Sequence, residues 1–272
     1  MKIAAIQMVS SPHLRTNLDA ARKLLSQAAS EGVELAVLPE YFCLLGFKDT
    51  DKLQIAEQPG HGQLQDFLTD CSRDLKLWIV GGTIPLATGP TEGQVAKVFN
   101  TTLVYSPAGQ CVARYDKMHL FRFDSGQESY DETRVLQPGS QPTTFDLPSL
   151  DGHTWRVGLS ICYDLRFPEL YRLLKAELLL VPSAFTFTTG QAHWEILLRA
   201  RAIENLAYVL AAAQGGLHDN KRQTWGHSMV VDPWGQVLAQ RNEGAGLVIA
   251  DVYKAQLDLQ RLRLPALTHT VL

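Results

Sequence analysis

The chain has 272 residues, of which 46% are hydrophobic and 19% are charged, and its formal net charge is −3. This balance excludes the strongly basic surface of a nucleic-acid-binding protein, and the length allows one large α/β core. The start "MKIAAIQMVSS" lacks the apolar centre of a signal peptide, and no run of 18 apolar residues occurs. We therefore expect a soluble cytoplasmic protein with a single domain over residues 1–272, which binds neither nucleic acid nor a membrane.

The first 40 residues predict a βαβ unit. "KIAAIQM" alternates like a strand, and apolar residues then recur at helical spacing between residues 18 and 28, with Asn17 as the expected N-cap. "VELAVLPE" predicts a buried strand that Pro39 closes.

The rest of the chain continues to mix strands and helices. Further strands are expected at "LWIVGGTI", "NTTLVYSP", "QCVARYD", "TWRVGLSIC", "AELLLVPSA", "AYVLAAAQ", "GHSMVVDP" and "QVLAQR". Helices are expected near residues 61–74, 167–176 and 191–206, and "PAGQ" and "DPWGQ" predict hairpin turns. Such a mixture predicts an α/β fold with helices covering the sheets.

The helix near residues 191–206 has a regular apolar face. Trp194, Leu198, Ala202 and Leu206 recur every four residues, and Glu195 can pair with Arg199. We interpret this helix as scaffold or dimer interface, because the periodicity explains Glu195 and His193 without a catalytic role.

Motifs for metals and cofactors are missing from the sequence. The four cysteines have no CxxC spacing, which favours reduced thiols, and the histidines have no HxH or HExxH spacing. We therefore expect no metal and interpret His119, His193 and His227 as hydrogen-bonding residues. Because GxSxG, Walker and helix-opening GxGxxG motifs are also absent, we expect no cofactor.

Three polar residues lie where predicted strands end, which is where α/β sheets hold their chemistry. Glu40 follows "AVLP", Lys117 follows "CVARYD", and Cys162 ends an alternating run. A carboxylate, an ammonium and a thiol supply a base, an oxyanion stabiliser and a nucleophile for acyl transfer. Each also has a simpler interpretation, since Cys162 could be a buried thiol, Glu40 a capping residue and Lys117 a solvated lysine.

The segments around these residues resemble the nitrilase superfamily of carbon-nitrogen hydrolases. "LPEYF", "YDKMHLF" and "SICYDLRFPELYR" are similar to its three signature segments, and the likeness continues through "PSAFTFTTGQAHWEILLRARAIENLAYVLAAAQ" and "GHSMVVDPWGQVLA". The chain is most similar to the Nit branch, whose members hydrolyse small carboxylated amides.

The resemblance implies a four-layer αββα sandwich, assembled as a homodimer, with Glu40, Lys117 and Cys162 as the catalytic triad. It also implies a second glutamate six residues before "PG", which is Glu132 and not Glu128. The sequence departs from the family pattern at Arg122 and Thr133, where aspartate and serine are common, and its end "LPALTHTVL" lacks the usual basic tail.

An amide needs an activated nucleophile, a cation at the oxyanion and a proton for the leaving amine. Glu40 is expected to exchange protons with Cys162, and Lys117 and the Tyr163 N–H to hold the oxyanion, while Glu132 orients Lys117 or the attacking water.

Arg166 lies four residues after Cys162 and could bind a substrate carboxylate, or it could pair with Glu169. Phe185 and Thr189 occupy positions where the family builds its pocket wall.

Three classes of function remain open. The first is a cysteine amidase that forms a thioester, with deaminated glutathione as the first substrate and 2-oxoglutaramate, the omega-amidase substrate, as the second. The second class is a hydrolase of N-carbamoyl amino acids or nitriles. The third is a binding protein without turnover, which the filled triad positions disfavour.

Overall fold

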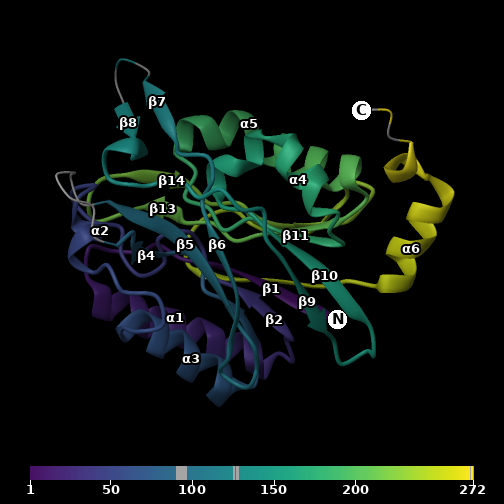
Figure 1. The fold of residues 1–272 in the computed structure, drawn as a ribbon, viewed down its shortest axis with the longest axis horizontal. Coiled ribbons are helices and arrows are strands. Elements are labelled where there is room, and N and C mark those ends of the chain that lie inside the picture. Colours follow the sequence, from purple (N-terminus) through teal and green to yellow (C-terminus); the bar gives the residue numbers. More distant parts are fainter. Residues whose placement is uncertain (90–96, 125, 127–128, 270, 272) are drawn as a thin grey trace.

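The structure is a computed structural model that describes residues 1–89, 97–124, 126, 129–269 and 271. Two β-sheets stack face to face, and helices cover the outer face of each (Figure 1). The architecture is the four-layer αββα sandwich expected from the sequence.

Each sheet has parallel strands at its centre and antiparallel strands toward its edges. The first sheet has the order β17-β1-β2-β3-β5-β4, with β6 paired to β5. Its strands are β1 (Lys2–Gln7), β2 (Leu35–Val37), β3 (Trp78–Val80), β4 (Ile84–Ala87), β5 (Val98–Tyr105), β6 (Cys111–Asp116) and β17 (Gly246–Asp251).

The second sheet has the order β16-β15-β12-β11-β10-β9. Its strands are β9 (Thr144–Pro148), β10 (Thr154–Leu159), β11 (Leu178–Leu180), β12 (Tyr208–Ala211), β15 (Ser228–Val231) and β16 (Val237–Arg241). Two short antiparallel pairs lie outside both sheets: β7 (Arg122–Asp124) with β8 (Ser129–Asp131), and β13 (Gly215–Leu217) with β14 (Gln223–Trp225).

The helices form the outer layers (Figure 1). The first sheet is covered by α1 (Leu14–Ser30) and α3 (Gln63–Leu75), and the second by α4 (Pro168–Leu174) and α5 (Phe187–Asn205). The remaining helical segments are α2 (Asp51–Gln54), α6 (Lys254–Arg263) and the 3₁₀ turns η1 (Glu132–Arg134), η2 (Cys162–Arg166) and η3 (Ala266–Thr268). Across the described residues, no helix has the length and apolar character needed to cross a membrane.

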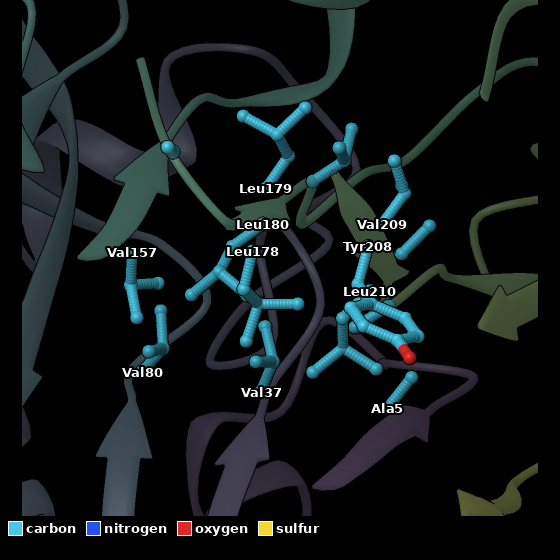
Figure 2. Packing of buried hydrophobic residues seen from close by; sticks show 14 of the residues in the cluster. Ala5, Val37, Val80, Val157, Leu178, Leu179, Leu180, Tyr208, Val209 and Leu210 are labelled. Atoms are coloured by element: carbon cyan, nitrogen blue, oxygen red, sulfur yellow. The ribbon is translucent and has the colours of Figure 1, made fainter. Parts of the chain in front are cut away.

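Strand alternation builds the core between the two sheets. Val37 and Val80 of the first sheet face Val157, Leu178 and Leu180 of the second (Figure 2). The intervening residue of β11, Leu179, points the opposite way, toward the helical layer. Because these strands are buried on both faces, they appear in the sequence as nearly continuous apolar runs.

The N-cap prediction at Asn17 is wrong, because α1 begins one turn earlier, after His13. The buried Asn17 side chain instead exchanges two 2.8 Å hydrogen bonds with the backbone of Ser11 and donates another, also 2.8 Å, to the carbonyl of Cys43. Asn17 thus ties α1 to the segment that follows Glu40.

Two predicted strands also differ from the structure. "LWIVGGTI" forms two strands rather than one, because Gly82 has a φ of +51° and its N–H turns back to the carbonyl of Val80. "TWRVGLSIC" leaves the sheet at Leu159, and Cys162 begins η2, because the N–H of Ile161 binds the Asp164 carboxylate. The predicted hairpins β5–β6 and β15–β16 are confirmed.

Candidate active site

Glu40 lies in a tight turn beyond β2. Gly82 approaches this turn so closely that a side chain there would meet the carbonyl oxygen of Pro39 at 2.1 Å. Tyr41 adopts a φ of +56°, and its N–H binds the hydroxyl of Thr83 at 2.9 Å. Gly82 thus lets the segment after β3 approach the turn that carries Glu40.

Lys117 follows directly after β6 and is almost completely buried. Its N–H binds the carbonyl of Asn100, and its own carbonyl accepts from the N–H of Gly139. A Cβ at Gly139 would lie 2.2 Å from the carbonyl oxygen of Asp116, so only glycine fits there. The "PG" pair therefore packs against the strand that positions Lys117.

Cys162 is the first residue of η2 and has a strained backbone, with a φ of +50°. Its N–H donates to the carbonyl of Pro182 at 2.9 Å. The fully buried carboxylate of Asp164 fixes the turn, since it accepts hydrogen bonds from the Ile161 N–H at 2.8 Å and the Tyr115 hydroxyl at 2.7 Å.

The structure brings Glu40, Lys117, Cys162 and Glu132 together. Lys117 Nζ lies 2.8 Å from Oε1 of Glu40, and 3.0 and 2.9 Å from the two carboxylate oxygens of Glu132. The Cys162 thiol lies close enough to the Glu40 carboxylate for that charge to raise its pKa. Four groups from separate segments therefore form one cluster.

The charges in this cluster shift one another's pKa values. Burial raises the pKa of Glu40, although Lys117 opposes the rise. Burial would also raise the pKa of Glu132, but the charges of Lys117 and Lys52 and the hydrogen bonds from Lys117 and the Phe121 N–H together hold that pKa below its usual value. The two carboxylates overcome the burial of Lys117 and raise its pKa well above 10.5, so it stays charged.

Burial and the nearby Glu40 charge raise the pKa of Cys162 well above 9.0. The resting group is therefore a thiol at neutral pH, and it needs a base when it attacks. Glu40, with its raised pKa, is suited to take that proton.

Cys162 opens into a pocket. All four residues predicted to bind substrate line it: Tyr163, Arg166, Phe185 and Thr189. Phe185 and Thr189 lie at the start of the α5 segment, and the Thr189 hydroxyl shares a 2.8 Å hydrogen bond with that of Thr186.

Arg166 ends η2 and projects along the pocket wall. Its guanidinium lies over the rings of Tyr163 and Phe185, at 5.8 and 5.5 Å, and its Nη1 is 3.2 Å from Nδ1 of His193. The alternative pairing with Glu169 is not observed, and within the described residues no acid forms an ion pair with Arg166. Its charge is therefore available in the pocket.

The carbon-nitrogen hydrolase family matches residues 2–262. The chain belongs to this family. It is 41% identical over 273 residues to the deaminated glutathione amidase of Synechocystis sp., a match that covers 98% of this chain and 97% of that one. This carbon-nitrogen hydrolase is thus an enzyme of the amidase type.

Solved structures agree with this assignment. The crystal structure of the Caenorhabditis elegans NitFhit protein matches with a TM-score of 0.86 and 37% identity, over 99% of this chain and 65% of that longer one. A variant of an amidase from Nesterenkonia sp. AN1, with acrylamide added to its active-site cysteine, matches with a TM-score of 0.75 and 27% identity, over 97% and 98% of the two chains.

Sequence reasoning missed several residues that this hydrolase places around the cluster. The Tyr41 hydroxyl donates to Glu132 at 2.8 Å, and the Asn100 side chain donates to Glu40 at 2.8 Å. The N–H of Ala184 donates to the second oxygen of Glu40 at 2.9 Å. Tyr41 stands next to Glu40 in "LPEYF" and could have been suspected, but Asn100 lies within a strand pattern that gives no signal.

The three histidines predicted to form hydrogen bonds each have a polar partner. His119 Nδ1 lies 2.7 Å from the Asp164 carboxylate, His193 contacts Arg166, and His227 Nδ1 lies 2.7 Å from the carbonyl of Trp225. Within the described ranges, no three of the side chains of histidine, cysteine, aspartate and glutamate gather as metal ligands. Glu128, the rejected alternative to Glu132, lies outside the described residues.

Proposed function

We propose that this amidase hydrolyses deaminated glutathione to 2-oxoglutarate and Cys-Gly through a thioester on Cys162. The observation that carries the proposal is the Lys117 ammonium held between Glu40 and Glu132, because these two carboxylates and Cys162 line a pocket that also contains Arg166. The relative from Synechocystis, which covers nearly the whole chain, is named for the same substrate.

The first half of the reaction forms the thioester. Glu40 takes the proton of Cys162, and the sulfur adds to the amide carbonyl. The developing oxyanion is held by Lys117 and by the backbone N–H of Tyr163, and one such donor contributes about 3 kcal/mol. When the C–N bond breaks, Glu40 returns the proton to the nitrogen, and Cys-Gly leaves.

The second half releases the acid. Glu40 takes a proton from water, the hydroxide adds to the thioester carbonyl, and the C–S bond breaks. The proton then returns from Glu40 to Cys162, which restores the thiol and frees 2-oxoglutarate. Glu132 acts by holding Lys117, since both of its oxygens lie within 3.0 Å of the ammonium.

Arg166 supplies the anchor for the acyl half in this proposal. The 2-oxoglutaryl group ends in a carboxylate, and a guanidinium can bind it through two parallel hydrogen bonds. Phe185 and Thr189 form the neighbouring wall. Because the side-chain partner of Arg166 in the described residues is the His193 ring at 3.2 Å and no acid is paired with it there, binding would not require a salt bridge to an acid to break.

A substrate panel tests the proposal. Deaminated glutathione, 2-oxoglutaramate, an N-carbamoyl amino acid and a simple nitrile are compared by kcat/KM. We expect deaminated glutathione to rank first, because binding energy from its dipeptide half can be used in the transition state. If 2-oxoglutaramate ranks first, the protein is an omega-amidase instead, and if the nitrile or N-carbamoyl compound ranks first, the amide assignment fails.

We also propose that the enzyme is a cytoplasmic homodimer. Exposed apolar side chains on α4 and α5, among them Leu173 and Ile196 at 66% and 70% exposure, offer a surface for a second copy. Sedimentation of the purified chain would give the mass of two chains, and a monomer at micromolar concentration would contradict the proposal.

A further inference from the structure

Lys52 places a second cation at the pocket. It lies on the short helix α2, lines the same pocket as Cys162, and its Nζ is 4.6 Å from the centroid of the Tyr41 ring. Burial lowers the pKa of Lys52, while the charges of Glu132 and Asp49 oppose this fall. In the part of the chain that the structure describes, no acid lies within ion-pair distance of its ammonium.

The two nearby carboxylates are already occupied. Asp49 accepts from Nη2 of Arg222 at 2.7 Å. Glu132 accepts from Lys117 with both oxygens, from the Tyr41 hydroxyl at 2.8 Å and from the Phe121 N–H at 2.7 Å. Lys52 is therefore a half-buried cation that lacks a dedicated protein anion, and such a group binds an anionic ligand readily.

Lys52 and Arg166 lie next to different members of the cluster. Arg166 follows Cys162 on η2, beside the nucleophile. Lys52 lies against Tyr41, which directly follows the base Glu40. Because Glu40 delivers a proton to the leaving nitrogen, the leaving half of an amide must extend toward the side of Glu40.

We propose that Lys52 binds the terminal carboxylate of a peptide-like leaving group and so makes this amidase selective for a substrate with a carboxylate at each end. The inference rests on the proposed function. Two extended residues span about 7 Å, which is within reach of a lysine side chain beside Glu40. A second, shallow hollow shares Tyr41, Leu45 and Lys52 with the main pocket, so Lys52 lies at the rim between the two.

The experiment compares the parent and one variant on three substrates. Lys52→Met removes the charge at similar length, and deaminated glutathione is compared with its C-terminal glycinamide and with 2-oxoglutaramate, which has no terminal carboxylate in its leaving group. We expect kcat/KM for deaminated glutathione to fall about 10- to 100-fold in Lys52→Met, because a charged contact is lost. The other two substrates should change less than about threefold.

Two controls separate this idea from simpler ones. Lys23→Met removes one exposed lysine of α1 and should leave all three rates unchanged. In the parent enzyme, which needs no variant to fold, the glycinamide should already be 10- to 100-fold slower than deaminated glutathione, by about the factor that Lys52→Met loses.

Three results would overturn the inference while leaving the amidase function intact. An equal fall for all three substrates would show that Lys52 acts on the acyl half, which the three share, or through the charge of Glu132. Parental rates with deaminated glutathione in Lys52→Met would show that Lys52 makes no contact with it, and equal rates of the acid and the glycinamide in the parent would show that the terminal carboxylate is not bound. Absence of turnover with every amide would instead refute the proposed function itself.

Discussion

Lys117 Nζ lies 2.8 Å from Oε1 of Glu40, and both side chains are 1% exposed. A buried ammonium beside one buried carboxylate would form a closed neutral pair, but here Glu132 adds a second carboxylate at 2.9 Å. Burial raises the pKa of Glu40, and the Glu132 charge adds to the rise, although the Lys117 cation opposes it. Lys117 thus stays charged for an oxyanion, and Glu40 is left to move protons.

Replacement of Cys162 should abolish turnover, whereas replacement of the other cysteines should not. Cys162→Ala removes the only thiol that meets Glu40 and the pocket, while Cys43 and Cys71 are buried elsewhere and Cys111 is exposed. Circular dichroism and steady-state rates for all four alanine variants would test this expectation. Measurable amide hydrolysis by folded Cys162→Ala would end the nucleophile assignment.

Glu132→Gln should lower kcat about 100-fold with a smaller effect on KM, which is the size of effect seen when an oxyanion donor is misplaced. The amide cannot hold the Lys117 ammonium with two charged oxygens, so the cation would shift toward Glu40 and hinder its proton transfer. Glu195→Gln, an exposed change on α5, is the matched control. A rise in KM at unchanged kcat would show that Glu132 binds substrate instead.

Arg166→Ala should lower kcat/KM for deaminated glutathione by roughly two to three orders of magnitude, since loss of a charged bidentate contact costs about 2–5 kcal/mol. Arg166→Lys should recover only part of the rate, because an ammonium lacks the planar fork. Arg172→Ala, an exposed change on α4, serves as the control. Parental activity in Arg166→Ala would mean that another group anchors the acyl carboxylate.

Buried thiols should make the fold less stable at alkaline pH. Burial raises the pKa of Cys43 from 9.0 to about 12. Below pH 9 both states keep the proton, but between pH 9 and 12 only the unfolded chain releases it, so the free energy of unfolding falls as pH rises. At pH 10 the ionisation of this one thiol lowers the free energy of unfolding by about 1.4 kcal/mol.

Urea unfolding at pH 7.5 and pH 10 provides the measurement. Between the two pH values, the free energy of unfolding of Cys43→Ala should fall by about 1.4 kcal/mol less than that of the parent, because the variant has no thiol to ionise at this position. Equal losses in the two proteins would show that Cys43 titrates alike in the folded and unfolded chains.

The sequence predicted the parts of the molecule that local pattern controls. Apolar alternation located β1, β10 and β12, and helical spacing located α1, α3 and α5. Glu40, Lys117 and Cys162 could be found because each follows a predicted strand. Their meeting in space also depends on how the two sheets stack, because β2 and β6 belong to the first sheet and β10 to the second.

Other features depend on contacts between distant segments. Asn17 was mistaken for a cap because its partners, Ser11 and Cys43, meet it only in the folded chain. Lys52 stands in a four-residue helix whose sequence resembles any solvated turn, and its place at the pocket depends on the chain turning back after Glu40. Such positions have no periodicity to detect.

The proposed mechanism depends on a covalent intermediate on Cys162. Enzyme is mixed with deaminated glutathione, quenched in acid during turnover, digested and analysed by mass spectrometry. We expect the peptide containing Cys162 to gain the mass of one 2-oxoglutaryl group and to lose it as the substrate is exhausted. Turnover without any acyl adduct at Cys162, or with the adduct on a different residue, would contradict it.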